Sequence, residues 1–348
     1  HIGTLRIKES FDKNQRESAH FYQALTEYIN STIEPVDAEL GTRPIKYLVL
    51  SGIETSLFLK MLGYDAPSQL TFINLRDFFE LYEKVKELNI PQLMQAFKLP
   101  EHRAEMVLPT ILLYHQMLAL SDVAQIVVSN VHFADGITIS HIADKAKDVW
   151  FSKIEEQIVS FARAMGRKYH YDPKHAHRVE ESALQIFDRL MKVHGLGARE
   201  RFILKVAAIL HDIGKFVSLR RHYFYSYRLI ISSDILGFSE EEKDLIANIA
   251  YYHSKGTPSG ADANFTDLPS DKRITLAKLA AIIRLADAID RSHIQKATIT
   301  EIALSGEELI ITISAEKDTS LEEWTFQDKA EFFESVFGIR PILKRQAG

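Results

Sequence analysis

One central stretch, residues 149–291, shows no convincing strand pattern, and it constrains the fold more than any other feature. Its apolar residues recur at helical spacing, Pro173 stands at the first turn of a helix, and Ser239 opens a capping box. The segments before and after it mix strand and helix patterns. We therefore predict an α+β chain with an α/β part at residues 1–147, an all-α domain at 148–295 and a small α+β subdomain at 296–348.

In the first part, strand and helix patterns alternate along the chain. Ile2–Ile7 alternates enough to be a strand, and the helical spacing that follows predicts a helix over 11–33 that Pro35 ends. A buried-type strand at 45–50 turns at Ser51-Gly52 into a helix, which is the usual setting for phosphate binding at a helix N-terminus. The further elements predicted here are helices at 54–62, 75–88 (with Asn74 as N-cap), 101–120 and 137–147, and a strand at 126–129.

The later parts divide just as clearly into elements. The patterns predict helices at 173–193, 199–211, 222–232, 240–253 and 271–290 in the central stretch, separated by polar loops. After it, we expect a hairpin of strands 297–304 and 308–314, a helix at 321–337 and a closing strand at 339–343.

The bulk composition excludes several classes of protein. The formal net charge is −5, so we expect no overall attraction to nucleic acid or to anionic lipid. The chain has no cysteine, which excludes disulfides, thiolate zinc sites and cysteine nucleophiles and fits a reducing, cytoplasmic location. No apolar run approaches membrane-spanning length, so we expect no membrane partner.

The helix predicted at 199–211 ends in His211-Asp212, and Gly214 then breaks the apolar pattern. Neighbouring helical residues point about 100° apart, so both side chains can reach one ion only at a helix end or bend. Asp287 lies in an apolar helical run, where an isolated charge is costly. Two imidazoles and two carboxylates suit Mn, Fe, Zn, Co or Mg. The metal ligands predicted on this basis are His175, His211, Asp212 and Asp287, with His253 as a further candidate.

Two alternatives to a metal site remain open at this point. The same residues could form a buried network of hydrogen-bonded polar groups. His177 also competes with His175 as the ligand, since the two residues are two positions apart and point to different faces of the helix.

A local basic patch adjoins the predicted metal ligands. Between Asp212 and Asp234 the sequence has no acidic residue. Basic side chains beside a metal suit phosphate oxygens, although a solvated helix face would have the same composition. The phosphate-binding residues predicted in this patch are Lys215, Arg220, Arg221, His222 and Arg228.

Five strings between His175 and Ser292 resemble, in order and spacing, the HD-domain metal phosphohydrolases. They resemble more closely the exopolyphosphatase and guanosine pentaphosphate phosphohydrolase family, which carries such a domain. Tyr225 stands where that family often has a second histidine. The strings are HAHRV at 175–179, LHDIG at 210–214, HYFYS at 222–226, YYH at 251–253 and RLADAIDRS at 284–292.

The first part resembles the second half of the same family's actin-like, ribonuclease-H-like phosphatase module. His1–Arg6 is similar to the strand after the family's glycine-rich phosphate loop, and residues 50–55 are similar to its "GTGGT" turn, with Gly52 retained. Ala134 stands where the family has an arginine. The resemblance implies phosphate binding at Ser51 and Gly52, and Mg or Mn in the actin-like cleft. It also implies that the phosphate loop and the water-activating glutamate precede residue 1, so we expect a fragment with no known catalytic residue that does not hydrolyse polyphosphate alone.

Three functions follow from these observations. The first is an exopolyphosphatase-related hydrolase that releases terminal phosphate from polyphosphate or guanosine pentaphosphate. The second places metal-dependent hydrolysis of a nucleotide or phosphate ester in the HD domain. The third is a non-catalytic module that binds a polyphosphate or nucleotide polyanion and dimerises, since the resemblance implies a homodimer.

Overall fold

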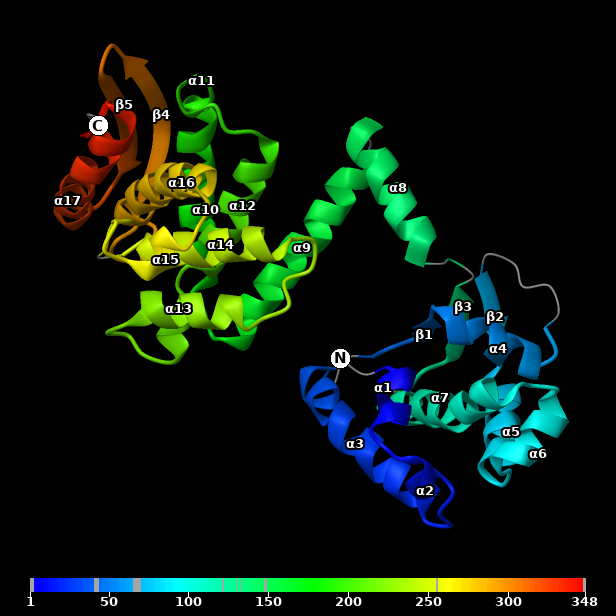
Figure 1. Cartoon of the computed structure of the whole chain (residues 1–348). Coiled ribbons are helices and arrows are strands. Elements are labelled where there is room, and N and C mark those ends of the chain that lie inside the picture. The colour runs from blue at the N-terminus through cyan, green and yellow to red at the C-terminus, as the bar shows by residue number, and fades with distance from the viewer. Residues whose placement is uncertain are drawn as a thin grey trace. The chain divides into compact units, whose positions relative to one another are not determined.

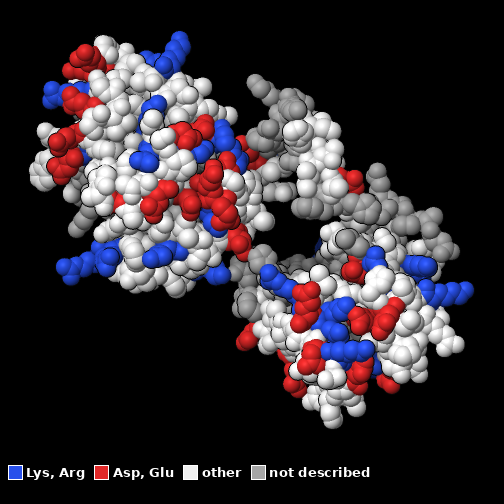
Figure 2. Space-filling model, viewed as in Figure 1, with Lys and Arg blue, Asp and Glu red and all other residues white. Residues whose placement is uncertain are grey.

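A computed structural model describes residues 3–40, 44–64, 70–120, 122–129, 131, 133–146, 149–254 and 256–346. The chain divides into two compact units, His1–Asp148 and Val149–Gly348, and each is described by itself (Figure 1). Both units mix helices with a small three-stranded sheet. No helix in the described ranges is long and apolar enough to cross a membrane. On the face that Figure 2 shows, acidic and basic side chains are interspersed.

The sheet of the first unit has the strand order β1-β3-β2, in which β1 (Tyr47–Leu50) runs parallel to β3 (Gln125–Ser129) and β2 (Leu70–Ile73) runs antiparallel to it. Ile126 and Val128 of β3 are fully buried in one core with Leu112 of a long helix. The helices of this unit are α1 (Thr4–Glu9), α2 (Lys13–Arg16), α3 (Phe21–Leu40), α4 (Ile53–Met61), α5 (Leu75–Lys86), α6 (Ile90–Phe97), α7 (Glu101–Ala119) and α8 (Phe133–Ala146).

Several predictions for the first unit are wrong, and each has a local cause. The predicted strand Ile2–Ile7 is the helix α1 over its described part, where the Ile7 amide donates to the Gly3 carbonyl. The predicted helix over 11–33 is the two helices α2 and α3, and α3 continues through Pro35 to Leu40, so this proline does not end the helix. The short elements β2 and α6 were not predicted.

Other predictions for this unit are confirmed. The Asn74 side chain accepts a hydrogen bond from the Arg76 amide and caps α5 as expected. β1, α4, α7 and β3 lie where the patterns place them, within one or two residues at most ends. The helix predicted at 137–147 corresponds to α8, which starts four residues earlier than expected.

The second unit is a helical bundle around α12 (Ala198–Leu210). Eight residues of α12, among them Leu204 and Ala208, are buried, since α9, α10, α14 and α16 all pack against this helix. Ser239 caps α14 as predicted, because its hydroxyl accepts from the Glu242 amide. The other helices are α9 (Val149–Lys168), α10 (Pro173–Arg189), α11 (Met191–His194), the 3₁₀ helix η1 (Ile213–Phe216), α13 (His222–Ile231), α14 (Glu240–Tyr252), α15 (Ala263–Thr266) and α16 (Ser270–Ile289).

The C-terminal strands and helix complete the core of this second unit. The hairpin of β4 (Ala297–Ser305) and β5 (Glu308–Ala315) forms as predicted, and β6 (Arg340–Arg345) joins β5 in parallel. α17 (Ser320–Phe337) packs against α16 and β6 (Figure 1). Ile311 and Phe333 are fully buried in one apolar core with the helices.

Candidate metal centre

The centre is built where α12 ends. His211 follows the last residue of α12, Asp212 precedes η1, and the chain then passes tightly under α13. Gly214 permits this close approach, because a Cβ atom there would lie 2.1 Å from the His222 carbonyl oxygen. The Gly214 amide also donates to the Ser226 hydroxyl at 2.9 Å. The glycine that ends the apolar pattern therefore brings α13, with His222 at its start, against the His211-Asp212 pair.

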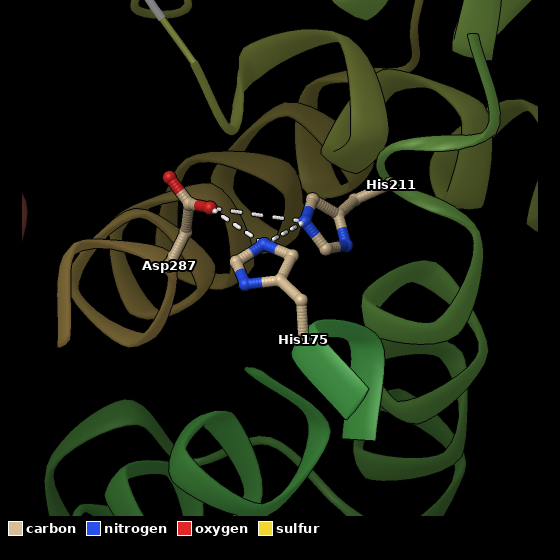
Figure 3. A group of neighbouring side chains, drawn as sticks. All are labelled: His175, His211 and Asp287. Atoms are coloured by element: carbon tan, nitrogen blue, oxygen red, sulfur yellow. Dashed lines mark hydrogen bonds and ion pairs between the residues drawn. The ribbon is translucent and has the colours of Figure 1, made fainter. Parts of the chain in front are cut away.

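Three buried side chains from separate helices point toward one another (Figure 3). The Nε2 atoms of His175 and His211 lie 3.2 Å apart. Asp287 Oδ1 lies 3.3 Å from the first of these nitrogens and 3.7 Å from the second. His175, His211 and Asp287 thus offer two nitrogens and one oxygen within 4.8 Å of one another.

The carboxylate of Asp212 faces the imidazoles of His175 and His211 on one side and those of His222 and His253 on the other. Its Oδ2 lies 3.7 Å from His175 Nε2 and 3.6 Å from His211 Nε2. Its Oδ1 lies 3.5 Å from His253 Nε2 and 3.6 Å from His222 Nε2, and these two nitrogens are 3.3 Å apart. Oδ1 is buried and has no hydrogen-bond partner among the described residues. The structure thus brings together all five predicted metal ligands, and it adds His222, which we had predicted to bind phosphate.

All four imidazoles are oriented in the same way. Each Nδ1 lies within hydrogen-bond distance of an oxygen that only accepts, so each ring donates through Nδ1 and turns Nε2 toward Asp212. A hydrogen bond at the outer nitrogen commonly fixes the tautomer of a metal-ligating histidine. The acceptors are Asp290 Oδ2 for His175 (2.9 Å), the Ala208 carbonyl for His211 (2.7 Å), the Leu219 carbonyl for His222 (3.0 Å) and the Ala250 carbonyl for His253 (2.6 Å).

The charges of this group suit a divalent cation. Burial lowers the pKa of His211 to about 3, so its ring is neutral and Nε2 carries a lone pair. Burial also opposes a charge on His175, but hydrogen bonds to Asp287 and Asp290 outweigh it and raise the pKa of His175 to about 9. Without a metal, a proton on His175 Nε2 therefore lies between this nitrogen and His211 Nε2. Two carboxylates, inward-facing nitrogens and an unpartnered buried oxygen fit a divalent cation with N/O ligands.

Ionised carboxylates complete this donor set. Burial acts to raise the pKa of Asp287, but the Lys329 ammonium and His175 hold it well below its usual range. Asp212 behaves in the same way, because the nearby imidazoles and Lys215 outweigh burial and hold its pKa well below the usual range. Both side chains are therefore anionic near neutral pH.

Three residues that the sequence reasoning did not assign hold the ligands in place. Asp290 binds His175 Nδ1 and also accepts from the Gln295 side chain at 3.0 Å. Lys329, on α17, donates to Asp287 Oδ2 at 2.5 Å. His293 stacks on the His175 ring with a centroid distance of 3.5 Å. Asp290 could have been found from its i+3 spacing to Asp287 on the apolar helix, whereas Lys329 carries no such signal.

The side of the centre that faces solvent is marked by three partly exposed side chains. The side chains of His222, His293 and Lys215 are 14%, 26% and 31% exposed, while those of His175 and His211 are buried. The Lys215 ammonium contacts Asp212 Oδ2 and lies 3.0 Å from His293 Nε2. A phosphate group would therefore reach the centre from this side.

The remaining predicted residues lie apart from the ligand group. His177 is 54% exposed and faces Glu181 at 3.3 Å, so it does not compete with His175. Arg220, Arg221 and Arg228 are exposed, and the last two lie over the ring of Phe224.

Ser51 and Gly52 belong to the first unit. Gly52 has a φ of 116° and precedes α4, whose first turn carries the carboxylate of Glu54. A carboxylate in that turn offsets part of the helix dipole that would attract phosphate. The predicted role of Ser51 and Gly52 in phosphate binding stays a prediction.

Comparison with known proteins supports one family for the helical part of the chain. Residues 160–329 match the family model described as Ppx/GppA phosphatase, domain III. A guanosine-5′-triphosphate,3′-diphosphate pyrophosphatase of Aeromonas hydrophila is 30% identical over 91 residues, which are 26% of this chain and 18% of that protein. The protein of the same name from Aeromonas salmonicida is 26% identical over 153 residues, which are 43% of this chain and 29% of that protein.

These matches span less than a third of the length of either Aeromonas relative. A crystal structure of the Aquifex aeolicus member of the Ppx/GppA protein family is also similar, with 16% identity and a TM-score of 0.35 over 41% of this chain and 47% of that chain. The family model and the two relatives together support a phosphatase related to the Ppx/GppA family.

Proposed function

We propose that the second unit holds the active site of a metal-dependent phosphohydrolase that cleaves a phosphoanhydride or phosphate ester. The observation that carries the proposal is the common orientation of four imidazoles, each of which presents Nε2 to the carboxylate of Asp212. A buried network of hydrogen bonds alone would leave the Nε2 atoms of His222 and His253 facing each other and Asp212 Oδ1 without a partner among the described residues, which is costly. This favours a cation site over the polar-network alternative.

The ligands divide into two groups that share Asp212. His175, His211, Asp287 and Asp212 Oδ2 would hold one cation. His222, His253 and Asp212 Oδ1 would hold a second. When bound, a divalent cation offsets negative charge on phosphoryl oxygens and makes water a stronger acid.

The residues around these groups have their own roles. Asp290 and Lys329 fix the orientation of His175 and Asp287 from outside. Lys215 lies on the solvent-facing side with an ammonium on a flexible stem, and it would move from Asp212 to a phosphate oxygen when substrate binds. His293 stands beside it and would donate a hydrogen bond to the same phosphate.

The comparisons support the substrate class that we propose. Both Aeromonas relatives are named for a guanosine pentaphosphate pyrophosphatase activity, and the matching family model is described as a phosphatase. We therefore place this chain among exopolyphosphatase-related phosphohydrolases that act on polyphosphate or on guanosine pentaphosphate. A second phosphate site at Ser51 and Gly52, in an actin-like cleft with Mg or Mn, belongs to the same proposal, as do the HD domain, the homodimer and the cytoplasmic location.

Release of orthophosphate tests the proposal. Chelator-treated protein would be assayed on polyphosphate, tripolyphosphate, pyrophosphate and guanosine pentaphosphate before and after addition of Mn²⁺. We expect release on at least one substrate that depends on the added metal and is lost in His211→Asn. His177→Asn, which changes an exposed histidine outside the centre, is the matched control. Release that survives in His211→Asn at the wild-type rate would place the chemistry elsewhere.

A further inference from the structure

An exposed aromatic ring lies beside the proposed metal centre. Phe216 is the last residue of η1 and is 55% exposed, although Ile213 and Gly214 of the same short helix are buried. The ring does not stand alone. The imidazole of His170 stacks on it with a centroid distance of 5.6 Å and an interplanar angle of 17°. Tyr169 packs near the same ring at 5.8 Å.

The conformation of His170 is unusual for a residue with a side chain. Its φ is 48°, in the left-handed region, at the position just past the end of α9 where glycine is most common. The turn is closed by a hydrogen bond from the Tyr171 amide to the Gly166 carbonyl at 3.0 Å. An imidazole at this position costs backbone strain, and it lies against Phe216.

Both chain segments that carry the ring pair also contact the metal centre. Phe216 follows Lys215, whose ammonium contacts Asp212 and lies 3.0 Å from His293 Nε2. On the other segment, Asp172 lies two residues after His170, accepts from the His175 amide at 3.1 Å and lies 3.5 Å from His293 Nδ1. The ring pair therefore lies on the two segments that supply Lys215 and Asp172 to the solvent-facing side of the centre.

We propose that His170 and Phe216 form a stacking site for the base of a nucleoside phosphate whose phosphate groups bind at the metal centre. The inference rests on the proposed function and favours its nucleotide substrates over inorganic polyphosphate. Stacking of a base on an aromatic side chain is worth about tenfold or more in affinity, and every base has a face that can stack. Inorganic polyphosphate has no such face, so the ring pair favours a nucleotide over it.

Ligands that share a diphosphate group and differ by the nucleoside test the inference on the whole chain. Isothermal titration in the presence of Mn²⁺ would compare guanosine and adenosine 5′-(α,β-methylene)diphosphate with methylenediphosphonate. The two kinds of ligand share a bridged diphosphate that resists hydrolysis and differ by the nucleoside. We expect the wild type to bind the nucleotides at least about tenfold more tightly than methylenediphosphonate.

Three variants test whether the nucleoside preference depends on the rings of Phe216 and His170. Phe216→Ala and His170→Asn should reduce the nucleoside preference to about twofold or less and leave methylenediphosphonate affinity unchanged, while Phe216→Trp should keep it. Asparagine is chosen at 170 because it tolerates the left-handed backbone. Val217→Ala shortens a 49% exposed apolar side chain in the same segment and should change nothing.

Three results would overturn the inference. They are a wild type without nucleoside preference, a preference that Phe216→Ala leaves intact, and a preference that Val217→Ala lowers as much as Phe216→Ala does. Orthophosphate release on the same preparations separates the two proposals. Metal-dependent orthophosphate release without a nucleoside preference would contradict the stacking site alone. A nucleoside preference that depends on Phe216, without metal-dependent release, would contradict the hydrolase and support the binding site.

Discussion

The ammonium of Lys329 lies 2.5 Å from Asp287 Oδ2 and 3.3 Å from the carbonyl oxygen of His253, so a residue of α17 holds two residues of the proposed metal centre. The Lys329 side chain is only 9% exposed. Asp287 thus turns one oxygen toward His175 and His211 and the other toward Lys329. The C-terminal helix is therefore part of the structure that shapes the centre, and its removal should disturb metal binding.

Replacement of Lys329 by methionine should destabilise the metal-free protein by about 3 kcal/mol or more, because breaking a buried ion pair leaves an unpaired buried charge. Urea unfolding of chelator-treated protein measures this loss. Lys317→Met changes an exposed lysine just before α17 and should cost little. Equal stabilities for the two variants would show that the Lys329–Asp287 pair does not stabilise the fold.

Substitution of Gly214 by alanine should disrupt the packing of η1 under α13. The added Cβ would lie 2.1 Å from the His222 carbonyl oxygen and 2.3 Å from the Ser226 nitrogen, and backbone atoms cannot move as far as a flexible side chain. We expect a loss of about 1–3 kcal/mol in thermal unfolding together with weaker metal binding. Gly260→Ala is the control, since a Cβ there meets nothing within 4 Å. Wild-type stability in Gly214→Ala would contradict the close approach.

The metal-free protein should lose stability on both sides of about pH 6.5. The pKa of His175 is raised to about 9, so its contribution is complete below pH 6.5 and is lost as the pH rises toward 9. The pKa of His211 is lowered to about 3 by burial, so its contribution is present above pH 6.5 and is lost as the pH falls toward 3.

Thermal unfolding of chelator-treated and Mn²⁺-loaded protein at pH 6.5 and 9 measures the upper side of this profile. A bound cation takes the place of the proton on His175, so the loss toward pH 9 should appear only without metal. A metal-free protein that is more stable at pH 9 than at 6.5 would show that His175 does not carry this proton.

The helical bundle could be predicted from the sequence because its long helices α10, α12, α14 and α16 bury apolar faces. α14 shows this best, since its apolar spacing and the capping box at Ser239 mark its start. β2 could not be found, because four residues are too few to show a period of two. α1 was mistaken for a strand for the same reason, as a six-residue segment fits both periods.

The ligands of the centre could be chosen from the sequence where a polar residue interrupts an apolar helix, as Asp287 does. His222 was not predicted as a metal ligand, because its position beside Asp212 depends on how closely Gly214 lets α13 approach. His293 and Lys329 could not be assigned at all. Their places depend on a loop with left-handed backbone and on the docking of α17, which no local pattern encodes.

The measurement that tests the central claim most directly is the metal content of the purified chain after dialysis against Mn²⁺, Fe²⁺, Zn²⁺, Co²⁺ or Mg²⁺. Asp212 is shared by both ligand groups, so Asp212→Asn should lower the bound metal sharply, whereas His177→Asn should keep the wild-type amount. We predict at least one tightly held divalent cation per wild-type chain. A wild-type chain that retains none of these metals, or an Asp212→Asn chain that retains as much as the wild type, would contradict the metal centre.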